Sequence, residues 1–401
     1  MKKKVTVIGL GYVGLPTLLL ISNNKNFKAC GYDINPKLLD ELRKGKTSIN
    51  EKSVKQNLKK YINDKINITE NIEASDIFII TVPSGLDYKL RQDKFPLYDV
   101  VKKIIKVLKE KNLIIIETTS EPGVTEEIKK FIFKRKPGLF DKIINRPKFF
   151  LAYCPERVFP GNIFYELRNN PRLIGGINQD STNQAEKFFK NFSLKTYPTN
   201  NKTAEVAKLI ENSYRNVQIG FVNELSNYAF KNDLDVKEII KLANLHPRIN
   251  LLRPGIGVGG HCIPIDPYFL IQNKFNKFEI LSSSLKANNH RTELIYKIIK
   301  KTILNKKIKE VNIYGATYKA DVCDFRESPA IKIINKLSSF HKIKINLFDP
   351  FLKGMNIIFN KNVRINPLLN TKKKLIYNIL LVFHKKFKKI KKQKNLLDFT
   401  F

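Results

Sequence analysis

The 401-residue chain is poor in several residue types, and each shortage narrows the class of protein it can be. It has no tryptophan, two methionines and four cysteines (Cys30, Cys154, Cys262 and Cys323), none of which form a Cys-x-x-Cys pair. Since there are also only five histidines, we expect no metal site and no disulfide framework. Unpaired cysteines are typical of the reducing cytoplasm.

Long apolar runs are missing too. No run approaches the roughly 18 residues that a membrane span needs. Met1 is followed by three lysines and a strand-like run, without the apolar core of a secretory signal. We therefore expect a cytoplasmic protein with no membrane partner. An apolar fraction of 42% in a chain of this length predicts a globular protein of two or three domains.

Acidic residues are scarce: 36 Asp and Glu stand against 73 Lys and Arg, which gives a formal net charge of +37. A nucleic-acid-binding protein would gather this charge on one face or tail, interleaved with aromatic residues. Here lysine is spread along every segment, and the one dense block, residues 385–394, is typical of a solvated helix face. We therefore expect no nucleic-acid partner, although the general field would attract an anionic substrate.

The chain opens with a pattern that binds dinucleotides. A strand-like run over 5–8 leads into Gly9-Leu10-Gly11-Tyr12-Val13-Gly14 and then into an apolar helical run over 15–22. The first glycine makes a tight turn, the second lets the backbone approach the pyrophosphate, and the third lets the helix pack on the strand. A second strand ends at Asp33, where a carboxylate accepts both ribose hydroxyls and repels a 2′-phosphate. The pattern predicts NAD rather than NADP as the cofactor.

Apolar periodicity predicts the order of the domains. Strand-like runs at 77–82, 113–117 and 149–153 alternate with helical stretches at 97–109 and 124–133, which indicates a doubly wound parallel sheet reaching to about residue 200. The pattern is then helical over 203–230, 236–245 and 281–304, and strands return at 311–314, 343–348 and 379–382. We predict an α/β protein with two Rossmann-like domains, residues 1–200 and 306–401, joined by a helical central domain, residues 201–305, that carries a dimer contact.

A glycine-rich loop places one cysteine near a carboxylate. Gly259-Gly260-His261-Cys262 is followed four residues later by Asp266. A thiolate adds readily to a carbonyl carbon, and small glycines let the backbone approach a bound substrate. Alone, this pattern fits an inert buried cysteine as well as a nucleophile.

Further polar residues stand where a ligand could reach them. Lys208 and Asn212 are spaced i, i+4 on the predicted long helix and could stabilise an oxyanion, although a solvent-facing pair has the same spacing. Thr119 ends one predicted parallel strand and Glu156-Arg157 ends another, at the edge where such sheets bind ligands. Glu156 could orient a water, and the guanidinium of Arg157 could hold an anion.

These motifs together resemble the UDP-glucose/GDP-mannose dehydrogenase family over essentially the whole chain. The matching segments are Gly9–Gly14, Glu117–Ser120, Cys154–Arg157, Lys208 with Asn212, Gly257–Cys262, Tyr318–Lys319 and Arg326–Pro329. Within the family, His246-Pro247-Arg248-Ile249-Asn250 looks like the branch that acts on UDP-N-acetyl-D-mannosamine. The UDP-N-acetylglucosamine branch shares much of the same pattern.

The resemblance implies a four-electron oxidation of a sugar C6 alcohol by two NAD, for surface polysaccharide synthesis, in a homodimer. Cys262 would hold the aldehyde as a thiohemiacetal and then a thioester, with Lys208 and Asn212 at the alkoxide and Asp266, Glu156 and Thr119 handling water. The implied NAD contacts are Gly9, Gly11, Tyr12, Val13, Gly14, Asp33, Ser84, Thr119 and Arg326. The implied UDP-sugar contacts are Arg157, Val158, Lys208, Asn212, Arg215, His246, Arg248, Gly259, Tyr318 and Lys319.

Three sites, one of them a pair of residues, depart from the family pattern. Ser84-Gly85 stands where Thr-Pro is usual, Pro160 replaces a second glutamate after Glu156, and Thr400 takes the place of a basic residue. Three other functions stay open on the sequence: a UDP-N-acetylglucosamine 6-dehydrogenase with the same mechanism, a two-electron dehydrogenase that needs no cysteine, and a nucleic-acid-binding protein resting on charge alone.

Overall fold

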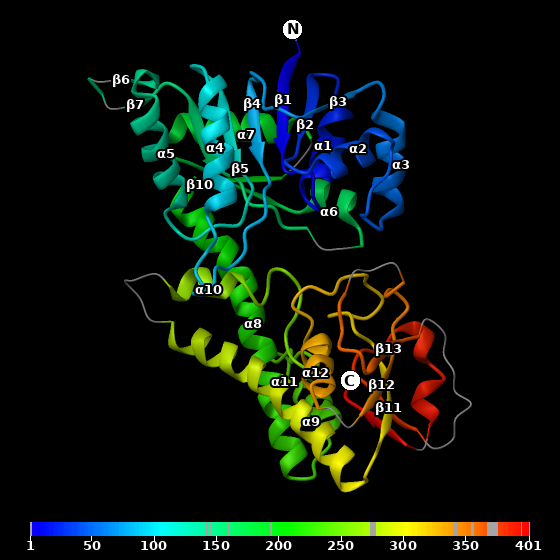
Figure 1. Ribbon diagram of the computed structural model, residues 1–401. Helices are drawn as coiled ribbons and strands as arrows, with labels where there is room; N and C mark the ends of the chain where they lie inside the picture. Colours follow the sequence, from blue (N-terminus) through cyan, green and yellow to red (C-terminus); the bar gives the residue numbers. More distant parts are fainter. Residues whose placement is uncertain are drawn as a thin grey trace. The chain divides into compact units, whose positions relative to one another are not determined.

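The structure, a computed structural model, describes residues 2–141, 143–144, 146–158, 161–192, 195–272, 278–340, 343–353, 357–366, 376–393 and 395–400 (Figure 1). The chain forms two compact units, the first of residues 1–210 and 268–273 and the second of residues 211–267 and 274–401. The three-domain division predicted from the sequence stays a prediction. Pro160, one of the departures noted above, lies outside the described residues.

The first unit is built on an eight-stranded sheet in the order β10-β9-β8-β5-β4-β1-β2-β3. Its strands are β1 (Lys3–Ile8), β2 (Phe27–Tyr32), β3 (Ile66–Thr69), β4 (Ile77–Ile80), β5 (Leu113–Ile116), β8 (Phe150–Tyr153), β9 (Arg172–Gly176) and β10 (Thr196–Asn200). The run β3-β2-β1-β4-β5-β8 is parallel and has the strand order of doubly wound nucleotide-binding sheets. Only the pairing of β8 with β9 is antiparallel within the described sheet. A short hairpin, β6 (Phe140–Asp141) and β7 (Arg146–Pro147), stands apart from it.

Helices cover both faces of this sheet, because its central strands are apolar on both sides. In β4, Ile77 and Ile79 pack into one core, whereas Phe78 and Ile80 pack into the other, as alternate residues of a strand must. The first core is closed by α1 (Gly14–Ser22), α2 (Pro36–Arg43), α3 (Lys52–Tyr61), α6 (Ile163–Asn169) and α7 (Gln179–Lys190). The second is closed by α4 (Phe95–Val107), α5 (Val124–Arg135) and the 3₁₀ turn η1 (Pro137–Leu139).

The second unit combines long helices with a five-stranded parallel sheet in the order β13-β12-β11-β14-β15. Its strands are β11 (Glu310–Tyr314), β12 (Lys344–Phe348), β13 (Val363–Ile365), β14 (Tyr377–Leu380) and β15 (Leu396–Asp398). Its helices are α9 (Val236–Ala243), α11 (Glu279–Asn305) and α12 (Pro329–Ser338), and the boundary between the units cuts α8 (Asn201–Lys231) and α10 (Asp266–Ile271). Ile295, Ile299 and Ile303 of α11 join α12 in the core on one face of the sheet.

The predicted α/β class is confirmed, and the long helical run predicted at 203–230 is α8. The basic block at 385–394 differs from the predicted helix face: two short 3₁₀ segments, η2 (Lys385–Phe387) and η3 (Ile390–Lys392), replace it. Phe387 and Ile390 are buried there, while the described lysines between and beside them are exposed. A period of three suits the 3₁₀ turn, which brings these two apolar side chains to one side.

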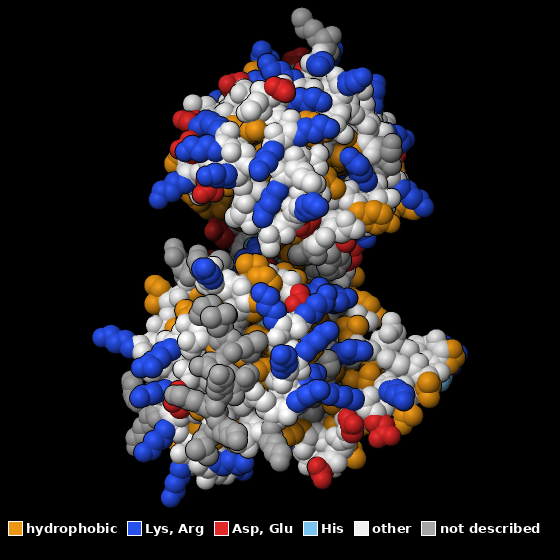
Figure 2. Space-filling view, turned by 90° about the vertical axis from the view of Figure 1, so that its right-hand side faces the viewer, with side chains coloured by type: hydrophobic (Ala, Val, Ile, Leu, Met, Phe, Trp, Pro, Cys, Tyr) orange, Lys and Arg blue, Asp and Glu red, His pale blue; other side chains and the backbone are white. Residues whose placement is uncertain are grey.

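Lysine and arginine side chains lie over much of the face shown in Figure 2, on both units, with few acidic side chains between them. Among the described residues, no helix is both long and apolar enough to span a membrane.

Candidate active site

The glycine turn after β1 has the geometry that its sequence predicts. Gly9 has φ +93°, and a Cβ on Gly14 would lie 1.7 Å from the Gly9 carbonyl oxygen, so each of these two positions requires glycine. A Cβ on Gly11 would meet no atom within 4 Å, so its backbone faces open space. The first turn of α1 has no side-chain cap at Val13. An open backbone at an uncapped helix N-terminus fits the pyrophosphate of a dinucleotide.

Asp33 lies beside this turn at the end of β2. Its Oδ2 accepts a hydrogen bond from the Leu10 amide at 2.7 Å, and its Oδ1 accepts one from the Asn35 amide at 2.9 Å. The residue is half-buried. A carboxylate held in this way could still accept the ribose hydroxyls of NAD.

Tyr12 of the same turn is held from a distant segment. Its hydroxyl donates to Glu51 Oε1 at 2.7 Å, and the buried Glu51 also accepts from the amides of Gly161 and Ile163, at 2.7 and 3.0 Å. Glu51 therefore ties the glycine turn to the segment that follows Glu156 in the chain.

Ser84 and Thr119 are joined by a glutamine that the motifs did not indicate. The buried Gln92 donates to Ser84 Oγ at 2.9 Å and to the Thr119 carbonyl at 3.4 Å, and it accepts from the Glu121 amide at 2.8 Å. Gln92 thus connects the loop after β4 to the loop after β5, which carry the predicted NAD contacts Ser84 and Thr119.

The carboxyl group of Glu156 is enclosed although the residue as a whole is half-buried. Its Oε1 is inaccessible and has no hydrogen-bond partner in the described part of the chain. Burial raises the pKa of Glu156 to about 7, against the opposing charges of Arg172 and Lys208. A carboxylic acid that titrates near neutral pH with an unoccupied oxygen is suited to general acid–base chemistry.

A buried ion pair fixes the backbone immediately before Glu156. Arg172 on β9 lies 3.1 Å from Glu117 Oε1 and donates to the carbonyls of Cys154 and Pro155 at 3.3 and 3.2 Å. Both charged side chains are almost completely buried, so removing one would leave the other charge without compensation. One guanidinium nitrogen, Nη1, lies within hydrogen-bond distance of the carboxylate and of both carbonyls.

Lys208 is placed by a glutamate one turn before it. Glu205 on α8 is fully buried and accepts hydrogen bonds from the amides of Gly123 and Thr125 at 2.6 and 2.9 Å, at the start of α5. A carboxylate is stabilising at a helix N-terminus, so this contact fixes the rotation of α8. Lys208 is itself buried, within electrostatic reach of Glu156.

In the second unit, Cys262 is exposed in a tight turn. Its carbonyl accepts from the amides of Ile265 and Asp266 at 3.0 and 2.8 Å, where α10 begins. The buried Asp266 accepts from Asn212 Nδ2 at 2.6 Å. Hydrogen bonds therefore connect three of the predicted catalytic residues, because Asp266 contacts Cys262 through its amide and Asn212 through its carboxylate.

The glycines before Cys262 are required by Tyr318. A Cβ on Gly259 would lie 2.6 Å from Tyr318 Cβ, and a Cβ on Gly260 would lie 3.1 Å from the tyrosine ring. The Gly260 amide donates to the Arg326 carbonyl at 2.9 Å, and Asp324 holds the Arg326 guanidinium through three contacts of 2.6–3.2 Å. Arg326 and Tyr318 are both within electrostatic range of Cys262.

A buried hydrogen-bond network of polar side chains on helices α8 and α11 holds the loop of Cys262. Asn216 donates to the Ile263 carbonyl at 3.1 Å and accepts from Ser284 Oγ at 2.9 Å and Asn288 Nδ2 at 3.2 Å. The network continues through hydrogen bonds of 2.6–3.0 Å among Asn223, Gly255, Arg291 and Asn227. The loop of Cys262 is therefore fixed at both of its ends.

The remaining predicted substrate contacts are described but not joined to this cluster. His246 and Arg248 are exposed in the turn after α9, which a reciprocal pair of hydrogen bonds between Asn244 and Leu251 closes. Arg215 and Lys319 are exposed, Arg157 donates to the Pro171 carbonyl at 3.0 Å, and Val158 packs against the core of the first unit. No group of three or more His, Cys, Asp or Glu side chains that could hold a metal ion occurs among the described residues.

Comparisons with known proteins agree with this geometry. Three family models match: the NAD binding domain of the UDP-glucose/GDP-mannose dehydrogenase family over residues 3–193, its central domain over 202–290, and its UDP binding domain over 312–399. A UDP-N-acetyl-D-mannosamine dehydrogenase of Campylobacter jejuni is 37% identical over 398 residues, 98% of each chain. Another, of Methanocaldococcus jannaschii, is 40% identical over 84% of this chain and 76% of the relative.

Solved structures give the same result. The fold resembles that of the UDP-N-acetyl-mannosamine dehydrogenase Cap5O of Staphylococcus aureus with a TM-score of 0.84 and 30% identity, over 99% of this chain and 94% of that one. A UDP-D-ManNAc dehydrogenase structure from Pyrococcus horikoshii has a TM-score of 0.87 and 29% identity, over 99% of this chain and 95% of that one.

The two glycines of the turn give a matched pair of variants. We predict that Gly11→Ala leaves the thermal midpoint near wild type but raises the KM for NAD by about tenfold or more, because its Cβ enters the space of the pyrophosphate. Gly14→Ala should lower the free energy of unfolding by more than about 2 kcal/mol, because its Cβ overlaps the Gly9 carbonyl. Thermal melts and initial rates test both. An unchanged KM for NAD in folded Gly11→Ala would contradict the assignment.

Proposed function

Since the chain belongs to the UDP-glucose/GDP-mannose dehydrogenase family and is an NAD-dependent UDP-sugar dehydrogenase, we propose that its substrate is UDP-N-acetyl-D-mannosamine. The product would be UDP-N-acetyl-D-mannosaminuronate, used in surface polysaccharide synthesis. The choice of sugar is supported by the names of the relatives and by the motif at 246–250. The observation that carries the reaction type is the exposed thiol of Cys262 in a turn fixed on both sides.

The chemistry divides between the cofactor and the side chains. NAD, when bound, supplies the hydride acceptor for both oxidations, so one alcohol, one water and two NAD⁺ give one carboxylate, two NADH and three protons. Gly9, Gly11, Gly14 and Asp33 would hold it at the glycine turn. The protein must then stabilise the alkoxide, keep the aldehyde, and cleave the acyl product.

Lys208 and Asn212 would act on the alkoxide. As a neutral amine Lys208 would take up the C6 hydroxyl proton, and the ammonium formed in this way would stabilise the negative charge on the C6 oxygen together with the carboxamide N–H of Asn212. Cys262 would then form a C–S bond with the aldehyde carbon, giving a thiohemiacetal that cannot diffuse away. The second oxidation turns this adduct into a thioester.

Glu156 would act in the last step. As a carboxylate it can take a proton from a water that attacks the thioester carbonyl, after which the C–S bond breaks and the Cys262 thiolate is restored. Its unoccupied buried oxygen and raised pKa support this role. Asp266 and Thr119 would help to place the water. A free thiol is kept in a reducing compartment, so we propose the cytoplasm as the site of the reaction.

We also propose a homodimer that uses α8. Tyr214, Phe221 and Tyr228 are each more than half exposed and are spaced by seven residues, so they follow one stripe of the helix. A second copy of this stripe would cover it. Light scattering should give a dimer for wild type, and Phe221→Asp should shift it toward monomer; a wild-type monomer would contradict the proposal.

The yield of NADH tests the proposed reaction. We expect two NADH for each UDP-N-acetyl-D-mannosamine consumed and no free aldehyde, with kcat/KM at least about tenfold above that for UDP-N-acetylglucosamine or UDP-glucose. One NADH with a releasable aldehyde would contradict the four-electron mechanism. A preference for UDP-N-acetylglucosamine would contradict the proposed sugar but not the four-electron mechanism.

The pH dependence tests Glu156. Because the base must be deprotonated, kcat should rise with pH through about 7 and then level, provided that hydrolysis limits turnover. Glu156→Gln should lower kcat by about a hundredfold or more and abolish this rise. Arg172→Gln should move the rise to higher pH, because the Arg172 charge lowers the pKa of Glu156. The exposed Glu224→Gln is the control, and a rise that persists in Glu156→Gln would refute the role.

A further inference from the structure

One buried histidine in the second unit takes no part in the chemistry described so far. His384 lies after β14, its side chain is fully buried, and its ring packs edge-on against Phe351 and Phe387 with centroid distances of 5.5 and 5.3 Å. A phenylalanine could supply this packing equally well, so the two ring nitrogens require another explanation.

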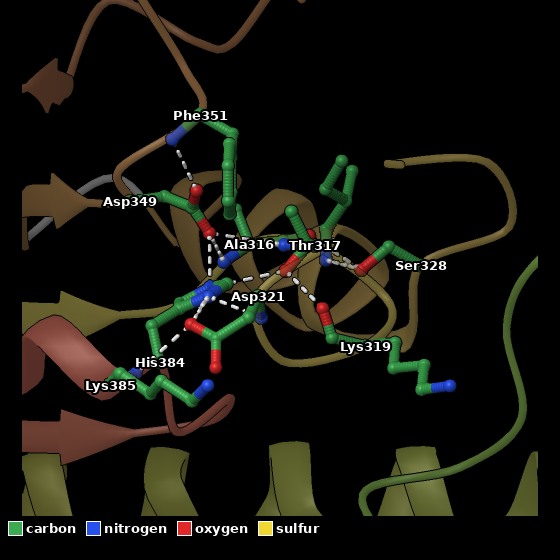
Figure 3. Close-up of polar contacts among 10 residues, drawn as sticks. Ala316, Thr317, Lys319, Asp321, Ser328, Asp349, Phe351, His384 and Lys385 are labelled. Atoms are coloured by element: carbon green, nitrogen blue, oxygen red, sulfur yellow. Dashed lines mark hydrogen bonds and ion pairs between the residues drawn. The ribbon is translucent and has the colours of Figure 1, made fainter. Parts of the chain in front are cut away.

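Each ring nitrogen of His384 has a defined partner (Figure 3). The Asp321 amide donates to Nδ1 at 2.9 Å, so Nδ1 is an acceptor. The ring proton is therefore on Nε2, which lies 3.0 Å from Oδ2 of the buried Asp349 and donates to it. Thr317 Oγ1 lies 3.1 Å from the same nitrogen. The imidazole thus bridges three segments that are far apart in the sequence.

Asp349 connects His384 to the loop after β11. Its Oδ2 accepts from the amides of Ala316 and Thr317 at 2.7 and 3.2 Å, and its Oδ1 accepts from the Phe351 amide at 2.9 Å. Burial alone would raise the pKa of Asp349, but His384 and these amides outweigh it and hold the pKa below its usual value. The Asp349 carboxylate is therefore ionised, and both of its oxygens accept hydrogen bonds.

The loop that these groups hold runs over residues 315–324 and carries Tyr318 and Lys319, two predicted UDP-sugar contacts. Asp349 fixes its start, and His384 fixes it again at the Asp321 amide. Thr317 Oγ1 donates to the Lys319 carbonyl at 3.0 Å, while the Lys319 side chain extends away from the cluster (Figure 3). Tyr318 meanwhile packs against Gly259 and Gly260 beside Cys262.

We propose that His384 is a positioning residue for substrate binding: by bridging Asp349 to Asp321, it fixes the loop that presents Tyr318 and Lys319 to the UDP-sugar. The proposal rests on the proposed function, because it takes the loop as part of the nucleotide-sugar site. The matched UDP binding domain, residues 312–399, contains both the loop and His384. His384 acts through the backbone and touches no reacting atom in this scheme.

Three variants separate packing from hydrogen bonding. His384→Phe keeps a ring for Phe351 and Phe387 but removes both polar contacts. His384→Asn keeps an acceptor near the Nδ1 position for the Asp321 amide, and His384→Gln keeps a donor near the Nε2 position for Asp349. We expect the largest effect for His384→Phe and partial rescue by Asn or Gln. The exposed His290→Phe on α11 is the matched control.

Binding of UDP alone is the decisive measurement. We expect the Kd for UDP and the KM for the UDP-sugar to rise about tenfold in His384→Phe, with the KM for NAD and the kcat at saturation within about threefold of wild type. UDP binding equal to wild type in folded Phe, Asn and Gln variants would overturn the proposal. So would equal losses in both KM values and kcat, which indicate a general structural role.

Loss of the role of His384 and loss of the proposed function give different results. If His384→Phe does not fold, the comparison of His384→Asn and His384→Gln with wild type decides the question by UDP affinity. If wild type binds UDP but oxidises no UDP-sugar, the proposed function fails while UDP binding still tests His384.

Discussion

Buried carboxylates that accept hydrogen bonds from main-chain amides hold the functional loops of this enzyme. Glu51 binds the amides of Gly161 and Ile163, Glu205 binds those at the start of α5, and Asp349 binds those after β11. An ionised acceptor makes a stronger hydrogen bond than a neutral one, and a carboxylate can accept several at once. In a chain with 36 acidic residues against 73 basic ones, these few acids therefore hold loops in place, while most of the described lysines are exposed.

The same arrangement of a glycine turn and an aspartate occurs after β1 in the first sheet and after β11 in the second, with different consequences. Gly9 and Gly315 have φ +93° and +90°, and their amides donate to the carbonyl of the last residue of β2 and β12 at 2.8 and 2.9 Å. The next residue is an aspartate that accepts from the turn: Asp33 in the first unit, Asp349 in the second. Asp33 is half-buried, and we propose that it receives the ribose of NAD. Asp349 is covered by His384, so in our proposal the loop that it positions, rather than the aspartate itself, contacts the nucleotide.

The sequence predicted those features that depend on local spacing. Unbroken apolar runs located β4 and β5, and the long helical run located α8. The glycine turn and the four-residue spacing of Cys262 and Asp266 hold in three dimensions. Arg172, Gln92 and His384 could not be predicted, because each connects segments that are distant in the sequence: Arg172 reaches Glu117, Gln92 reaches Thr119 and His384 reaches Asp321. The short edge strands β13 and β15 and the antiparallel β9 likewise depend on tertiary contacts that no periodicity reveals.

Glu156 in the first unit and Cys262 in the second, the two residues to which we assign the hydrolysis and the covalent step, are supported by different kinds of groups. Around Glu156 the supporting groups are charged, and the balance between burial and the charges of Arg172, Lys208 and Glu117 places its titration near neutral pH. Next to Cys262 the support from α8 and α11 begins with the uncharged groups Asn216, Ser284 and Asn288. A carboxamide both donates and accepts, so it can extend a buried network without bringing a charge near the thiol. Arg326, whose guanidinium is held by Asp324, is a charged group within electrostatic range of Cys262.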